Sequence, residues 1–190
     1  QVFFDFKKNN QNINGILNSQ INFQSLLKKP QFSSDIKIKN FKYDDFKLGE
    51  INFYSNWDEV NNHFVLNGGM VNENNHSEIS LKNCYFFPNN EMTSKLQGEI
   101  GFNQTNIDFL NPFLPNALLY ELNGLVSGNL TLSGDWSEPK FNGVLNLKNG
   151  SLKLKEYNTS FNINTEILVY DNSIEITDGN ITDELNIAGN

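Results

Sequence analysis

LNGLVSGNLTLSGDWSEPKFNGVLNLKNGSLKLKEY, residues 122–157, is the most regular passage of the chain and decides the fold class. Apolar residues and glycine alternate there with serine, threonine and asparagine, at the even positions of 126–132 and at the odd positions of 141–147. A period of two is typical of a half-buried strand. Glycine, aspartate and proline within 134–139 supply a turn. The passage therefore predicts neighbouring antiparallel strands with one apolar and one polar face.

The same alternation continues beyond this passage. Asn149-Gly150 is typical of a hairpin turn and predicts a further strand from Leu152. Short apolar pairs then recur, separated by polar residues. We expect one face of one curved sheet to carry the apolar residues of these strands, which are Val126, Leu130, Leu132, Phe141, Leu145, Leu147, Leu152, Leu154, Phe161, Ile163, Ile167, Val169, Ile174 and Ile176.

Similar segments fill the N-terminal half, so the sequence predicts an all-β chain, a long antiparallel meander of roughly a dozen or more strands. Residues 1–190 show no internal boundary and read as a single β-rich segment. One short helix is expected near 111–122, because Asn111 can cap it and two prolines fall in its first turn. A sheet this long must curl or split, since twist accumulates from strand to strand. Periodicity leaves open whether it forms an open groove or a packed sandwich.

The composition narrows the class of function. A net charge of −8 argues against nucleic acid as a partner, because binding phosphates needs clustered lysine and arginine. The single cysteine excludes an internal disulfide. No apolar run is long enough to cross a membrane as a helix, and Gln1 does not open a secretory signal. Any export signal or membrane anchor is therefore expected outside this chain.

No group of residues indicates catalysis or a metal. His63, His76 and Cys84 lack the close pairing of zinc ligands. The acidic stretch 171–184 lacks the glycine and the final glutamate of a calcium-binding EF-hand loop, and its two isoleucines fit a strand. Nothing selects a pair of carboxylates for glycoside hydrolysis. We therefore expect a protein that is not an enzyme and has no metal or cofactor.

Several motifs, taken in order, resemble a known family. They are Lys39-Asn40-Phe41-Lys42-Tyr43, Leu48-Gly49, Ser55-Asn56-Trp57-Asp58, Asn111-Pro112-Phe113-Leu114, the glycine–leucine pattern from Gly124 to Leu152, Asn158-Thr159-Ser160-Phe161 and the closing Asp183 to Gly189. Over residues 36–190 the chain resembles the C-terminal region of TamB, the AsmA-like translocation and assembly module, in its Bacteroidetes-type form.

The resemblance implies a β-groove, a half-pipe of sheet, within a larger envelope-spanning protein of a Gram-negative bacterium. That protein would lie in the periplasm, anchored to the inner membrane by a segment not present here. The groove would shield phospholipid acyl chains on their way to the outer membrane, with an Omp85-class (TamA/BamA-like) protein as partner. Phenylalanine makes up 16 of the 24 aromatic residues, which favours lipid over sugar as ligand.

Two other functions stay open at this point. An open sheet edge could assist the assembly or secretion of outer-membrane proteins by serving as a template for strand pairing. A structural or adhesive β-sandwich at the cell surface would show the same alternation. A polysaccharide-cleaving enzyme is a more distant alternative.

Overall fold

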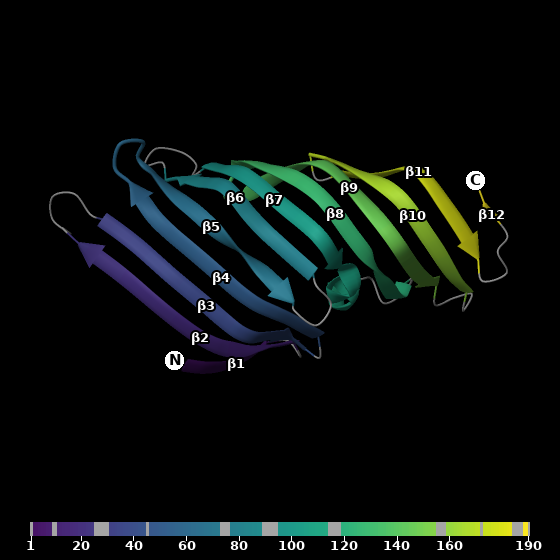
Figure 1. The fold of residues 1–190 in the computed structure, drawn as a ribbon, viewed down its shortest axis with the longest axis horizontal. Coiled ribbons are helices and arrows are strands. Elements are labelled where there is room, and N and C mark those ends of the chain that lie inside the picture. Colours follow the sequence, from purple (N-terminus) through teal and green to yellow (C-terminus); the bar gives the residue numbers. More distant parts are fainter. Residues whose placement is uncertain are drawn as a thin grey trace.

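A computed structural model describes residues 2–8, 11–24, 31–44, 46–72, 77–88, 95–113, 119–154, 159–171, 173–183 and 188–189. These residues form one antiparallel sheet of 12 strands that follow one another in sequence order (Figure 1). The strands are β1 (Val2–Lys8), β2 (Gln11–Gln24), β3 (Gln31–Tyr43), β4 (Phe46–Asp58), β5 (His63–Asn72), β6 (Ser77–Phe87), β7 (Lys95–Asn106), β8 (Leu119–Asp135), β9 (Glu138–Leu154), β10 (Thr159–Tyr170), β11 (Ser173–Asp183) and β12 (Ala188–Gly189).

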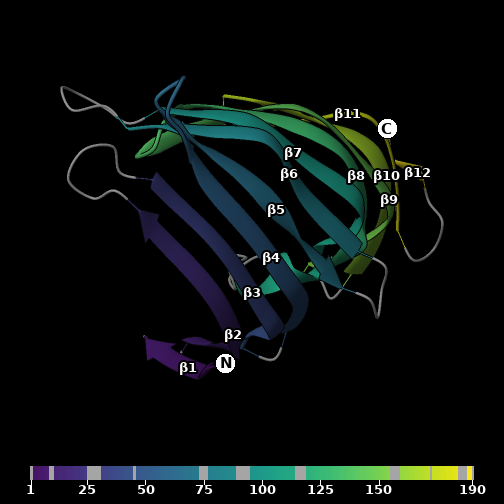
Figure 2. The ribbon, with the colours of Figure 1, turned by 60° about the vertical axis from the view of Figure 1, so that its left-hand side comes forward.

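The sheet is curled and does not close. Its two outermost strands, β1 and β12, lie at opposite ends of the row, and the strands between them bend around a common hollow side (Figure 2). The predicted all-β meander is therefore confirmed. A sandwich of two packed sheets is not what the described residues form, because all their strands belong to one hydrogen-bonded sheet.

The strand register places the expected apolar residues on one face. Leu130 is paired with Gly143 across β8 and β9, and Leu145 is paired with Ile167 across β9 and β10. Ile167 is in turn paired with Ile176 across β10 and β11. Paired residues of antiparallel strands point to the same side of the sheet. One face therefore continues from β8 to β11, as the alternation predicts.

Register shifts bend several strands where a residue other than glycine has a positive φ. Asn40 in β3, Asn83 in β6, Gln104 in β7 and Asn149 in β9 have φ between 46° and 52° and lie at such shifts. A bulge of this kind inserts an extra residue and increases bending and twist. The predicted hairpin turn at Asn149-Gly150 is wrong, because β9 runs through this bulge to Leu154.

The predicted helix near 111–122 is also wrong. A 3₁₀ helix, η1 (Ile107–Phe113), ends before most of that range, residues 114–118 lie outside the described residues, and β8 already begins at Leu119. The Asn111 side chain accepts a hydrogen bond from the Leu122 N–H (2.7 Å) and donates one to the Leu122 carbonyl (2.9 Å). Leu122 also pairs with Leu152 of β9. Strand pairing therefore holds Leu119 and Leu122, two leucines of the expected helical stripe.

The apolar face is the concave one. Ile107 of η1 packs on Val126 and Leu147, and the partly buried residues around this cluster come from β7 to β10. The same short helix contacts both β8 and β4, two strands that are separated by three others in the sheet. It therefore lies on the side toward which the sheet curls. Among the described residues, no helix is both long and apolar enough to cross a membrane.

Candidate functional site

The inner face is defined here as the side of the sheet that carries Leu130 and Leu145. Register extends it toward the N-terminus through positions that share this side, which include Ile13, Leu17, Ile21, Phe23, Phe32, Ile36, Ile38, Ile51, Phe53, Trp57, Phe64, Leu66, Met70, Ile79, Leu81, Phe86, Leu96, Ile100 and Phe102. Sequence analysis did not assign these residues to the face, although their alternation has the same period. The face therefore spans most of the sheet.

Charge is separated between the two faces. From β2 to β11, the inner-face positions that strand register pairs carry no Glu, Lys or Arg and one Asp, Asp183, which pairs with Phe161 at the end of β11. Charged residues pair on the opposite, outer face, as Lys82 does with Glu99. An ionised side chain in an apolar surface loses its hydration. The inner face is therefore suited to apolar ligands and the outer face to water.

Exposure varies along the inner face. Its middle is covered, with Val126, Leu130 and Leu147 each less than 10% exposed. Toward the two edges of the sheet it opens, and Phe23 in β2 is 60% exposed and Ile176 in β11 58% exposed. The remaining expected lining residues of β8 to β11 share this face by register, and the side chain of Leu154 lies outside the described side chains. The opening leaves large apolar side chains accessible at both edges.

Hydroxyl groups interrupt the inner face without leaving unpaired polar atoms. Ser34 and Ser55, opposite each other in β3 and β4, share a hydrogen bond of 2.9 Å. Thr105 and Thr165 donate to the backbone carbonyls of Glu78 (2.7 Å) and Thr177 (2.8 Å). A buried hydroxyl that is hydrogen-bonded presents mainly carbon to its surroundings. These positions therefore do not form polar binding sites.

Aromatic side chains line one margin of the inner face. Ring centroids lie 5.1 Å apart for Phe23–Phe32, 5.6 Å for Phe32–Phe64, 4.9 Å for Trp57–Phe64, 6.1 Å for Phe64–Phe86 and 5.5 Å for Phe86–Trp136. This row, called the aromatic rim below, crosses from β2 to the turn between β8 and β9. Trp136 in that turn is 65% exposed. The rim was missed in the sequence, because its members lie far apart along the chain.

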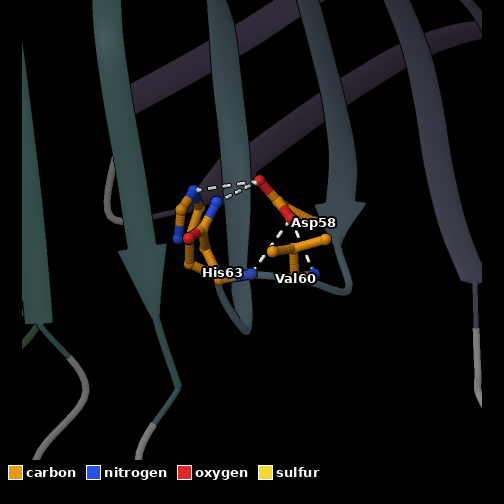
Figure 3. Close-up of polar contacts among 4 residues, drawn as sticks. Asp58, Val60 and His63 are labelled. Carbon is orange, nitrogen blue, oxygen red and sulfur yellow. Dashed lines mark hydrogen bonds and ion pairs between the residues drawn. The ribbon is translucent and has the colours of Figure 1, made fainter.

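A polar group on the outer face surrounds the turn between β4 and β5 (Figure 3). The Asp58 carboxylate accepts hydrogen bonds from the backbone N–H groups of Val60 (2.9 Å) and Asn61 (3.1 Å) and from the Asn61 side chain (2.9 Å). These bonds, the side-chain bond from Asn61 first, lower the pKa of Asp58. His63 Nε2 lies 3.9 Å from the carboxylate, and the imidazole packs on the rings of Tyr85 and Phe87. The arrangement caps a tight turn.

Cys84 is buried on the inner side, where its Sγ covers Gly98. Burial raises the pKa of the thiol, the opposite of what a reactive cysteine needs. His63 lies on the outer face, so the structure does not bring these two residues together, and His76 lies outside the described residues. Within the described ranges, no group of three histidine, cysteine or acidic residues could hold a metal ion.

Two other features belong to the outer side or its turns. Asp171, from the acidic stretch 171–184, lies 3.4 Å from the Lys140 ammonium, and the isoleucines that follow it belong to β11 as predicted. A hollow of about 510 Å³ lies across β1 to β5, with Phe3, Ile16 and Lys42 among its lining residues. It is separate from the apolar strip of the inner face.

A family model described as "TamB, N-terminal domain" matches residues 70–147, which cover β6, β7, η1, β8 and most of β9. Over these residues the chain is similar to TamB. The matched part contains the covered middle of the inner face of this TamB-like sheet. The resemblance to the family is thus confirmed. The matching model describes the N-terminal domain of TamB, whereas the sequence motifs resemble its C-terminal region. No curated protein and no solved structure matches the TamB-like chain.

Proposed function

We propose that this TamB-like chain is a non-enzymatic periplasmic segment that shields phospholipid acyl chains between the inner and outer membranes of a Gram-negative bacterium. It would be one segment of a larger envelope-spanning protein that is anchored in the inner membrane elsewhere and works with an Omp85-class protein in the outer membrane. TamB-family proteins belong to the Gram-negative envelope, which supports this location.

The observation that carries the proposal is the inner face, where Asp183 at the end of β11 is the one charged residue among the register-paired positions from β2 to β11. It is continuous by register from β2 to β11, it is concave, and its large apolar side chains stay accessible toward both edges of the sheet. A packed core would bury these side chains against a second layer. A row of interchangeable apolar contacts instead lets a lipid tail move along the face without breaking any directional bond.

The energy scale fits this role. A phospholipid tail that crosses water exposes its methylene groups at about 0.8 kcal/mol each, so a tail of ordinary length faces a penalty on the order of 10 kcal/mol. Contact with an apolar face removes much of that penalty. Catalysis would require side chains of defined chemistry, whereas shielding requires only apolar surface that is free of charge.

Assistance to outer-membrane protein assembly is the second candidate. One observation favours it: the sheet does not close, and its described edge strand β1 pairs only with β2. Exposed backbone groups at a strand edge can pair with an incoming strand. In this case the bound client would be an unfolded β-protein, and contacts would map to the edge strands instead of the inner face.

Mass spectrometry of the lipids that co-purify with the chain tests the proposal. Ile21 and Gln20 are adjacent in β2 on opposite faces, since Ile21 pairs with Ser34 and Gln20 with Asp35. Ile21 is 51% exposed, so Ile21→Asp should fold. We expect Ile21→Asp to reduce bound phospholipid severalfold, because the tail would have to desolvate a charge. Gln20→Asp places the same charge on the outer face and should bind as the wild type does.

Circular dichroism of both variants establishes that they are folded. Equal lipid content in Ile21→Asp, Gln20→Asp and the wild type would contradict the proposal. So would the absence of phospholipid from the folded wild-type chain after incubation with phospholipid vesicles. Cross-linking of unfolded outer-membrane protein to β1, without lipid on the inner face, would support the second candidate instead.

A further inference from the structure

We propose that the aromatic rim holds the headgroup of a bound phospholipid and prefers headgroups that carry an ammonium group. This inference rests on the proposed function and extends it, since it assigns an orientation and a lipid class to the same face. The rim, the opposite margin of the sheet and the charges around Trp136 each contribute an argument.

The residue composition of the rim is typical of a protein surface at an interface between hydrocarbon and water. Its members Phe32, Trp57, Phe64 and Phe86 share the inner face by register, so the rim continues directly from the surface proposed to hold the tails. Trp136 extends the row into the exposed turn between β8 and β9. An indole combines an apolar ring with a polar N–H, which is why tryptophan is enriched where hydrocarbon meets water.

The opposite margin is blocked in the middle of the sheet. There η1 lies on the inner face, with Ile107 packed on Val126 and Leu147. The helix is fixed by the two hydrogen bonds between the Asn111 side chain and the backbone of Leu122. If the tails of a lipid lie on the inner face beside η1, that short helix blocks the margin opposite the aromatic rim. Its headgroup is left to project over the aromatic rim.

The ring geometry suits a cation. The Phe32–Phe64, Trp57–Phe64 and Phe86–Trp136 pairs are edge-to-face, with interplanar angles of 81°, 65° and 69°. Such pairs turn some ring faces away from their neighbours. The face of an aromatic ring carries negative potential and attracts ammonium groups. Trp136, which is 65% exposed, therefore offers its ring face to a cationic headgroup at the end of the rim.

Two acidic residues flank the turn at the exposed end of the rim, at positions that register assigns to the outer face. Asp135 and Glu138 are paired across the turn that holds Trp136, and like charges in directly opposed positions repel each other. Lys95 is the other register partner of Asp135, which leaves one carboxylate in excess. The whole chain also carries a net charge of −8. A headgroup ammonium would relieve the local repulsion, whereas a purely anionic headgroup would add to it.

The test is a competition between two lipids with identical acyl chains. The chain is incubated with vesicles of equimolar phosphatidylethanolamine and phosphatidylglycerol and purified again, and the ratio of bound lipids is measured by mass spectrometry. We expect phosphatidylethanolamine to be enriched about two- to fivefold, as one cation–π contact at an exposed site implies. Trp136→Leu keeps an apolar side chain but removes the indole face, so it should lose much of the enrichment while total bound lipid stays constant.

Trp136→Phe is the matched control, since it keeps an aromatic face and should keep most of the enrichment. Both substitutions fall at an exposed turn position, which protects the fold. Bound lipid with no preference, a preference for phosphatidylglycerol, or an enrichment that Trp136→Leu leaves unchanged would overturn the headgroup assignment and leave tail shielding intact. Absence of both lipids from the folded chain would overturn the proposed function itself, and this inference with it.

Discussion

Leu130 and Gly143 face each other across β8 and β9, and a Cβ added at Gly143 would lie 3.1 Å from Cδ2 of Leu130. The neighbouring pair repeats this relationship with the strands exchanged, because Leu145 faces Gly128 and would lie 3.1 Å from a Cβ added there. Each leucine thus covers the backbone of the glycine opposite. This gives a physical reason for the alternation of glycine and leucine in the central strands.

Replacing Gly143 by alanine should destabilise the sheet. Its φ is +156° and an added Cβ would lie 2.3 Å from the backbone oxygen of Asn129, which cannot move without disturbing the ladder. We expect the free energy of unfolding to fall by about 1–3 kcal/mol, measured by urea denaturation. Gly101→Ala is the control, since the nearest atom there, at 2.7 Å, is the rotatable hydroxyl of Ser80. Equal losses would show that backbone geometry is not the cause.

The bulge at Asn149 gives a second prediction. Asn149 has φ of 51°, and its N–H donates to the Asn164 side chain at 2.8 Å. Asn149→Val should lower the free energy of unfolding by about 1–2 kcal/mol, because a β-branched residue is strained at positive φ, whereas Asn149→Gly should cost little. Asn146→Val, in the same strand before the bulge, is the control. Thermal melts of the three variants measure these losses of stability. A loss for Asn149→Val no larger than the losses for Asn149→Gly and Asn146→Val would contradict the bulge.

The inner face between β8 and β11 could be predicted from the sequence because side chains alternate strictly along a strand. Once the alternation in each strand is known, a shift of one residue in register would move all the apolar side chains of that strand to the other face together. The Asn149-Gly150 turn could not be predicted correctly. Asparagine at positive φ serves a hairpin turn and a bulge equally well, and only pairing with β10 decides between them.

The helix near 111–122 and the aromatic rim were beyond sequence analysis for a related reason. Leu119 and Leu122 are compatible with a helical stripe. They belong to a strand because they pair with Leu154 and Leu152. The rim joins residues as distant as Phe23 and Trp136. Its ring contacts depend on the order of the strands in space, which local periodicity does not encode.

The thiol of Cys84 should be unreactive in the folded chain. It is buried, burial raises its pKa, and its Sγ lies 3.5 Å from each of the carbonyl oxygens of Lys82 and Glu99. Thiolate is the reactive form, so both shielding and the raised pKa slow its modification. Ellman's reagent at pH 8 should detect almost no thiol in buffer and one per chain in urea. Rapid reaction of the native chain would contradict the buried position.

Asp58 should contribute stability that is lost in acid. Hydrogen bonds from Asn61 and Val60 lower its pKa below the ordinary value of 3.8, so the folded chain binds this proton less readily than the unfolded chain. The contribution is therefore complete above pH 3.8 and disappears as pH falls through the lower folded value. Asp58→Ala should lower the urea midpoint at pH 5, and the gap to the wild type should narrow at pH 2.5. A constant gap would exclude this linkage.

The middle of the inner face gives the sharpest comparison between a lipid path and a packed core. Leu145 and Val144 are adjacent in β9 on opposite faces, since Leu145 pairs with Ile167 and Val144 with Leu168. Leu145 belongs to the partly buried shell around Ile107, whereas Val144 is 38% exposed. Leu145→Asp should lower the free energy of unfolding by about 1–3 kcal/mol if its carboxylate reaches water through the open side of the curl, and by several kcal/mol more if it stays buried.

Thermal melts and lipid content should be measured on Leu145→Asp and Val144→Asp together. We expect both variants to fold and only Leu145→Asp to lose bound phospholipid, because a tail on the inner face would have to pass the new charge. Complete unfolding of Leu145→Asp with an intact Val144→Asp would mean that this level of the sheet is a closed core, and the lipid path would then have to lie over the exposed residues nearer the edges. A folded Leu145→Asp with full lipid content would exclude the inner face of β9 as the path.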